Sequence, residues 1–152
     1  MPLNLFDILD RALMTRLKAV TKREAIDELV ELLRLNNNIS DKTKILPKLW
    51  ERENIMSTGI GMGVGIPHIR LATVDRPLIS IGIQPQAVKD YLSIDEQPVR
   101  IIIIIICPEN QELLHTQILA QLINVLKSDD VINKLLQADN SQEIYNIFTA
   151  NI

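Results

Sequence analysis

A run of six consecutive isoleucines, Ile101 to Ile106, does most to limit what this chain can fold into. With its flanks the apolar segment spans Val99 to Cys107 and is interrupted by Arg100 alone, far short of the ~20 residues that a membrane-spanning helix needs. β-Branched residues favour strands, and a run without polar alternation is typical of a strand buried on both faces. The run therefore predicts a central strand between two layers of helices, and hence an α/β fold.

The other hydrophobic patterns agree with this fold class. Thr21 and Glu24 form a capping box, and apolar residues then recur at helical spacing up to a stop at Asn36. Residues 78–84 have the pattern of a strand, and residues 17–20 that of a short one. Further helices are expected over residues 41–54, 109–126 and 131–137 and after a cap at Ser141. Pro47 either kinks the first of these or marks its first turn.

Length and composition favour one ordinary domain, residues 1–152, without repeats or linkers. The net charge of -3 and the absence of a cluster of basic and aromatic residues argue against a nucleic-acid partner. Asp7 and Asp10 interrupt the apolar N-terminus, so it lacks the pattern of a secretory signal. A single cysteine, Cys107, fits a reducing compartment. We therefore expect a cytoplasmic protein with no direct membrane insertion.

Four of the five glycines alternate within residues 57–68, directly before His68. Glycine permits unusual backbone angles and close approach, so the segment predicts an accessible backbone leading to one imidazole. His68 is then a candidate nucleophile or ligand. The alternative is a glycine-rich bend with an incidental histidine.

Several established motifs do not fit this glycine run. The spacing does not match the dinucleotide-binding fingerprint, because Val64 and Ile66 stand where its third glycine is needed. It does not match the phosphate-binding Walker loop either, because that motif ends in a lysine and this run does not. A zinc site would need His68, His115 and Cys107 to meet without any local ligand spacing. A Cys107–His115 hydrolase is equally weak, because that thiol ends a buried strand. We expect no cofactor and no metal.

Together, three segments carry a family resemblance. Arg52-Glu53, residues 57–61 (Ser-Thr-Gly-Ile-Gly) and residues 63–68 (Gly-Val-Gly-Ile-Pro-His) resemble the signature of enzyme IIA domains of the phosphoenolpyruvate-dependent phosphotransferase system, in the fructose/mannitol and nitrogen-regulatory branch. Residues 97–99, Cys107-Pro108 and the helix that carries His115 extend the resemblance over nearly the whole chain. It implies one α/β domain with a mixed sheet flanked by helices on both faces.

The resemblance also implies roles for individual residues. His68 would accept a phosphoryl group from the phosphocarrier HPr or a paralogue, since an imidazole of ordinary pKa is largely neutral at cytoplasmic pH. Arg52 would donate hydrogen bonds to the phosphoryl oxygens, and its alternative is a solvated arginine at a helix end. His115 would assist as a neutral donor without carrying the group, and its alternative is a core histidine. The backbone at Thr58, Gly59 and Gly61 would bind the phosphoryl oxygens.

Partner docking is expected on an apolar patch of Ile60, Met62 and Ile69 beside His68. Two positions depart from the family pattern: Gly65 replaces the usual alanine, and Ile69 replaces the glycine that usually follows the histidine. A β-branched residue resists positive φ, so the chain should leave His68 in an extended or helical conformation. Arg70 could supply an additional charge facing the phosphate or point into solvent.

Three functions remain open. The first is a phosphotransferase component, a phosphohistidine intermediate that takes its phosphoryl group from HPr and passes it to an enzyme IIB for sugar uptake. The second resembles the nitrogen-regulatory members: a binding module, phosphorylated in the same way, that acts mainly by docking to a kinase or transporter. The third is a structural domain that is never phosphorylated, which the presence of both histidines and Arg52 disfavours.

Overall fold

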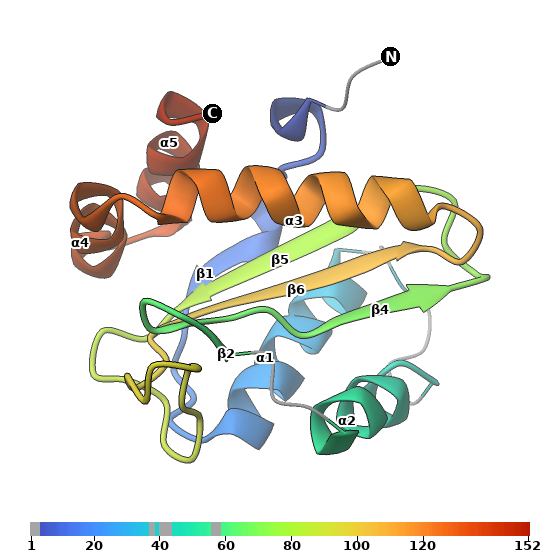
Figure 1. Ribbon diagram of the computed structural model, residues 1–152, viewed down its shortest axis with the longest axis horizontal. Helices are drawn as coiled ribbons and strands as arrows, with labels where there is room; N and C mark the ends of the chain where they lie inside the picture. The colour runs from blue at the N-terminus through green and yellow to red at the C-terminus, as the bar shows by residue number, and fades with distance from the viewer. Residues whose placement is uncertain (1–3, 37–38, 40–43, 56–58) are drawn as a thin grey trace.

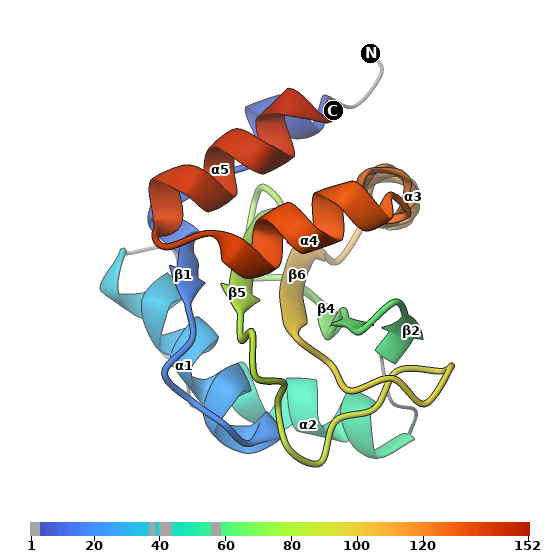
Figure 2. The ribbon, with the colours of Figure 1, turned by 90° about the vertical axis from the view of Figure 1, so that its left-hand side faces the viewer.

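Strand β6 (Ile101–Pro108), which contains the isoleucine run, lies in the middle of the protein between two layers of helices (Figures 1 and 2). The structure is a computed structural model that describes residues 4–36, 39, 44–55 and 59–152. Helices α1 (Lys22–Leu35) and α2 (Leu46–Ile55) cover one face of the sheet. Helices α3 (Glu112–Leu126), α4 (Asp129–Gln137) and α5 (Ser141–Ala150) cover the other. The α/β expectation is confirmed.

The isoleucines of β6 divide between two hydrophobic clusters, which explains why the run has no polar alternation. Ile101, Ile103 and Ile105 pack in the cluster that includes residues of α3, such as Ile118. The intervening Ile102, Ile104 and Ile106 pack in the cluster that includes residues of α1, such as Leu29. All six isoleucines are fully buried. Alternate side chains of a strand point to opposite faces, so both faces of β6 require an apolar residue.

The described residues form a mixed sheet of six strands, as the family resemblance implied. Its order is β1-β5-β6-β3-β2, and β4 also pairs with β6. The β5–β6 and β2–β3 pairs are antiparallel, whereas β1–β5, β3–β6 and β4–β6 are parallel. The remaining strands are β1 (Met14–Arg16), β2 (Gly59–Gly61), β3 (Val64–Gly65), β4 (His68–Leu71) and β5 (Leu78–Ile83). Two short 3₁₀ turns, η1 (Leu5–Asp7) and η2 (Arg11–Leu13), precede β1.

The short strand expected at residues 17–20 is wrong, because the strand lies earlier, at β1. Side chains occupy backbone groups of residues 18 and 19 that a strand ladder would have used. The Glu28 carboxylate accepts hydrogen bonds from the N–H groups of Lys18 (3.1 Å) and Ala19 (2.9 Å). On the acceptor side, the Gln84 amide donates to the Ala19 carbonyl at 2.8 Å.

The helix boundaries follow their caps. Thr21 accepts a hydrogen bond from the Glu24 N–H at 3.3 Å, which confirms the start of α1. Pro47 is the second residue of α2, in the first turn, where a helix does not need its N–H; residues 40–43 of the expected segment lie outside the described residues. Asn140, not Ser141, caps α5, because its side chain accepts from the Glu143 N–H at 3.0 Å. No described helix is long and apolar enough to cross a membrane.

Candidate phosphoryl-transfer site

The glycine run folds into the β2–β3 hairpin, not into an open loop. Met62 and Gly63 make its turn after Gly61, the last residue of β2, and all three have positive φ angles, of 60°, 72° and 106° respectively. A side chain at Gly63 would place its Cβ 2.9 Å from the Pro98 carbonyl oxygen. Gly61, Gly63 and Gly65 are all buried, so the expectation of an accessible backbone is wrong for these three positions.

Gly65, the departure from the family's usual alanine, makes room for Tyr91. A Cβ at position 65 would lie 2.3 Å from the Tyr91 hydroxyl oxygen, closer than any real contact. Tyr91 is 1% exposed, and the Lys22 ammonium lies 4.3 Å from its ring centroid. That ammonium also forms an ion pair with the buried Glu53 of α2, at 2.7 Å. The glycine therefore permits a buried contact between α1 and α2, the helix that carries Arg52.

His68 is the first residue of β4 and pairs with Ile105 of the central strand. The Pro67 carbonyl before it accepts a hydrogen bond from the Ile105 N–H at 3.0 Å, which fixes the start of the strand. The chain leaves His68 in a strand, which is the extended one of the two expected conformations. His68 is partly exposed, whereas the next residue is buried, as strand alternation requires.

The His68 imidazole is held in one orientation by its own backbone. Its Nδ1 lies 2.7 Å from the Ile66 carbonyl oxygen. A carbonyl can only accept, so Nδ1 carries the proton in this contact and Nε2 keeps a free lone pair. Burial lowers the pKa of His68 below its ordinary value, the Ile66 carbonyl raises it, and the charges of Arg52 and Glu53 act in opposite directions. A neutral ring is therefore favoured at pH 7.

His115 lies beside His68. It is the fourth residue of α3, in the early turns as expected, and the two ring centroids are 4.6 Å apart with the rings tilted by 43°. Burial first, and then the charges of His68, Arg70 and Arg52, lower the pKa of His115 to about 4. Its Nδ1 is buried and has no hydrogen-bond partner among the described residues. His115 is thus neutral at pH 7, and the lack of an acceptor favours the tautomer with its proton on Nε2.

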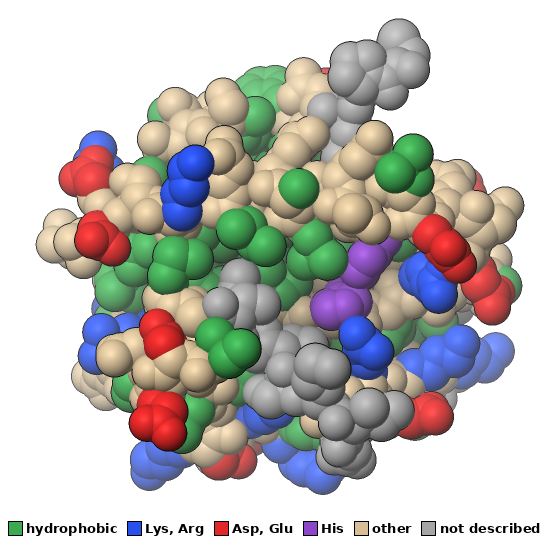
Figure 3. Space-filling model, in the orientation of Figure 1, with side chains coloured by type: hydrophobic (Ala, Val, Ile, Leu, Met, Phe, Trp, Pro, Cys, Tyr) green, Lys and Arg blue, Asp and Glu red, His purple; other side chains and the backbone are tan. Residues whose placement is uncertain are grey.

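Both histidines line one pocket of about 810 Å³, together with Arg52 from α2. Figure 3 shows the two histidines next to each other at the surface, with cationic side chains nearby and a hydrophobic area on one side. The positive charges of Arg52 and Arg70 contribute to the lowered pKa of the His115 ring. The other described residues that line the pocket are Lys48, Glu51, Ile69, Arg70, Glu109, Glu112 and Thr116.

The family comparison agrees with this arrangement. Residues 8–151 match the family described as "Phosphoenolpyruvate-dependent sugar phosphotransferase system, EIIA 2". The chain belongs to this EIIA 2 family. The sequence resemblance is thereby confirmed over nearly the whole chain.

Relatives of this EIIA 2 chain include both sugar-transport and regulatory proteins. It is 30% identical to a "PTS system fructose-specific EIIA component" of Haloferax volcanii, over 93% of this chain and 96% of the relative. It is 27% identical to a "Nitrogen regulatory protein" of Bradyrhizobium diazoefficiens, over 90% and 88% of the two chains.

Two solved structures have the same fold. The nitrogen regulatory protein IIA-Ntr of Neisseria meningitidis superposes with a TM-score of 0.81 at 24% identity, covering 95% of this chain and 98% of that one. Enzyme IIAMtl of Escherichia coli, in its complex with phosphorylated enzyme IIBMtl, gives 0.74 at 22% identity, covering 93% and 97%.

The structure separates the expected site residues of this EIIA 2 domain into two groups. It brings Arg52, His68 and His115 together at the pocket. Gly59 and Gly61 are the first and last residues of β2, and Gly61 does not line the pocket. Thr58 is outside the described residues.

Burial reduces the exposed area of the expected docking patch. Ile69 is only 9% exposed and packs in the cluster on the α1 side, so the expectation that it forms exposed surface is wrong. Met62 is partly buried and lines a hollow of about 160 Å³ with Pro98, Ile132 and Leu136. The side chain of Ile60 is outside the described residues.

Cys107 pairs with Arg70 between β4 and β6 and is fully buried. Burial raises the pKa of its thiol to about 11, so the thiol stays protonated at pH 7. Among the described residues, no three His, Cys, Asp or Glu side chains are grouped as a metal site requires.

His115 should remain neutral down to acidic pH. We expect its ring to titrate near pH 4, whereas an ordinary histidine titrates near 6.5. Because the unfolded chain then binds more protons between these values, stability should fall as the pH drops from 6.5 towards 4. His115→Gln should make this fall shallower. Imidazole ¹H–¹⁵N NMR and urea unfolding at several pH values measure both effects, and titration near pH 6.5 would contradict the burial of this ring.

Proposed function

We propose that this chain is a phosphoryl carrier of the phosphotransferase system, which accepts a phosphoryl group on Nε2 of His68 from a phosphohistidine of HPr or an HPr-like protein. The observation that carries the proposal is the 2.7 Å contact from Nδ1 to the Ile66 carbonyl. It leaves Nε2 with a free lone pair, on a ring that lines an open pocket, which supports Nε2 as the nucleophile.

The transfer needs no proton acceptor at His68. The Nε2 lone pair forms the new N–P bond while the N–P bond of the donor breaks, and the donor nitrogen keeps the electron pair of that bond. His68 retains its Nδ1 proton, so its phosphorylated ring is a cation, and the donor ring becomes neutral as the phosphoryl group leaves. The Ile66 carbonyl accepts from this N–H and so stabilises the charged product.

Arg52 and His115 stabilise the group during transfer. The transition state is loose, with negative charge on the equatorial phosphoryl oxygens, so catalysis depends on positioned donors. Arg52 lines the pocket, and its planar, charged guanidinium can donate two hydrogen bonds to the phosphoryl oxygens. His115 is neutral, and its ring centroid lies 4.6 Å from that of His68. It offers one N–H donor, and its lone pair is on the buried Nδ1, so the ring does not compete for the phosphoryl group.

The phosphoryl group then passes to an enzyme IIB or serves as a regulatory signal. The fructose-specific relative supports the first outcome and the nitrogen regulatory relative the second. The structural neighbour in complex with phosphorylated IIBMtl supports a IIB protein as the partner. The hollow beside Met62 supplies apolar surface for such docking. We place the exchange in the cytoplasm, which the lone cysteine Cys107 favours.

Incubation with phosphoenolpyruvate, enzyme I and HPr tests the proposal. Intact-mass spectrometry should show one added phosphoryl group that is labile in acid and stable in base. Addition of a fructose IIB should then discharge it if the chain acts in sugar transport, whereas persistence with IIB present would favour the regulatory role. No added mass with any HPr-type donor would refute the carrier function.

A further inference from the structure

Arg70 and Glu112 form an ion pair in the wall of the pocket, with 2.7 Å between Nη1 and Oε1. We propose that Arg70 is a second phosphoryl-binding arginine, which Glu112 holds until His68 is phosphorylated and which then turns from Glu112 to the phosphoryl oxygens. This inference rests on the proposed function of His68. In this role the Arg70 guanidinium switches between two anionic partners, the Glu112 carboxylate and the phosphoryl group.

Strand geometry places Arg70 on the same side of β4 as His68. Residues two apart on a strand share a face, and the burial along β4 alternates as this requires. His68 is partly exposed and Arg70 exposed, whereas the intervening Ile69 and the following Leu71 are buried. Both exposed side chains line the pocket. A phosphoryl group on His68 therefore enters the space that the guanidinium already borders.

The present partner of Arg70 is easily exchanged. The side chains of Arg70 and Glu112 are 42% and 80% exposed, and ion pairs this open to solvent contribute little to stability. A phosphoryl group offers two or three charged oxygens and can accept both arms of the guanidinium. Glu112, at the first residue of α3, keeps a favourable interaction with the helix dipole after Arg70 has left.

The other charged residues described in the lining of the pocket come from elements other than β4. Lys48, Glu51 and Arg52 all come from α2, which covers the face of the sheet opposite to that covered by α3. Glu109 precedes α3, and its N–H donates to the Leu71 carbonyl at the end of β4. Arg70 is therefore the cation that β4 itself contributes. Its charge already acts on the neighbouring His115 ring.

Removal of each partner of the switch should have opposite effects on the phosphoryl-transfer equilibrium with HPr. Arg70→Ala should shift the equilibrium about tenfold towards phospho-HPr, because charged hydrogen bonds to the product are lost. Glu112→Gln should shift it about threefold towards this chain, because the competing carboxylate is gone. In the Arg70→Ala background, Glu112→Gln should have no effect, since there is no guanidinium to release.

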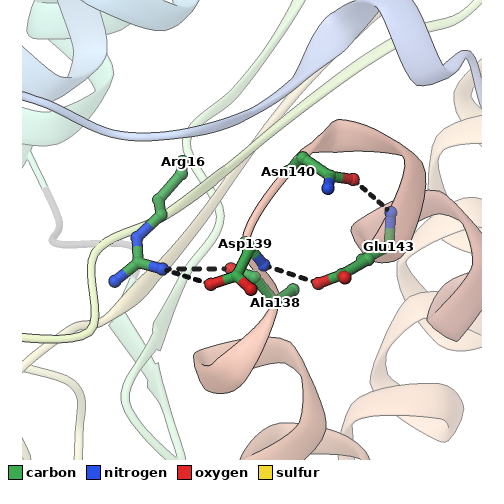
Figure 4. Close-up of polar contacts among 5 residues, drawn as sticks. All are labelled: Arg16, Ala138, Asp139, Asn140 and Glu143. Atoms are coloured by element: carbon green, nitrogen blue, oxygen red, sulfur yellow. Dashed lines mark hydrogen bonds and ion pairs between the residues drawn. The ribbon is translucent and has the colours of Figure 1, made fainter.

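A second ion pair in the same protein is a matched control. Arg16 pairs with Asp139 at 3.5 Å between the sheet and the α4–α5 connection, with side chains 45% and 80% exposed (Figure 4). Arg16 also donates to the Ala138 carbonyl, and neither residue lines the pocket. Arg16→Ala and Asp139→Asn change charge by the same amounts as the test variants. Both controls should leave the equilibrium unchanged.

Titration of the unphosphorylated proteins with inorganic phosphate, followed by ¹H–¹⁵N NMR of the arginine side chains, tests the switch without any phosphoryl transfer. We expect the Arg70 signal to move, with phosphate affinity about threefold higher in Glu112→Gln. If HPr does not phosphorylate the wild type but this titration behaves as expected, the carrier function fails and the anion switch stands. If Arg70→Ala matches Arg16→Ala in both assays, or if Glu112→Gln has the same effect with and without Arg70, the inference is overturned.

Discussion

Replacing His68 by alanine should abolish phosphoryl acceptance from phospho-HPr. The variant lacks the only ring whose Nδ1 is bonded to the Ile66 carbonyl, and therefore the free Nε2 lone pair that attacks phosphorus. Since His68 is partly exposed, its truncation should leave the two buried clusters intact. Intact-mass spectrometry after incubation with the donor system should show the unmodified mass, and circular dichroism should show an unchanged fold.

His115→Gln is the matched control for that variant. It removes the other histidine of the pair but keeps an N–H donor, so it should still accept one phosphoryl group, more slowly than the wild type. His115→Ala should be slower again, because the donor is lost. A phosphorylated His68→Ala protein would place the nucleophile elsewhere, and equal rates in the wild type and both His115 variants would return His115 to a purely structural role.

Replacing Arg52 by alanine should slow phosphoryl acceptance by about 10²–10³, the usual cost of removing one donor aimed at transition-state charge. Arg52 is exposed on α2, so its loss should not change the melting temperature noticeably. Lysine should restore only part of the rate, since an ammonium cannot bind two phosphoryl oxygens with a planar fork. Rapid-quench measurement of transfer from phospho-HPr gives the rates.

Lys44→Ala supplies the control for this loss of charge. Lys44 is exposed, precedes α2 and is not among the described residues that line the pocket. It should therefore change the rate only as far as long-range steering of the partner depends on net charge, an effect that disappears at high salt. If Arg52→Ala and Lys44→Ala have the same small effect, Arg52 is a solvated residue at the end of its helix.

The layers of the fold could be predicted from sequence because burial is encoded locally. The isoleucine run needed apolar partners on both faces, and the structure supplies them from α1 and α3. The cap at Thr21 likewise depends only on residues three apart. The strand expected at residues 17–20 is wrong because a side chain of the following helix, Glu28, binds the N–H groups of residues 18 and 19.

The site could be predicted residue by residue only where the family signature names the residue. Arg52, His68 and His115 meet as the resemblance implied. The glycine run and Ile69 were misjudged because their exposure depends on tertiary neighbours, such as Tyr91 against Gly65. The Arg70–Glu112 pair joins residues 42 apart in sequence, a contact that no local spacing indicates. Strand periodicity alone could have placed Arg70 beside His68.

The nitrogen that carries the phosphoryl group tests the proposed chemistry most directly. Phosphorylation of ¹⁵N-histidine-labelled protein, followed by ³¹P and long-range ¹H–¹⁵N NMR, distinguishes the two ring nitrogens of His68 and separates them from those of His115. We expect a single phosphorylated nitrogen, Nε2 of His68, with a proton retained on the Nδ1 that faces Ile66. Phosphorus bonded to Nδ1 of His68, or to His115, would contradict the assignment of Nε2 as the nucleophile.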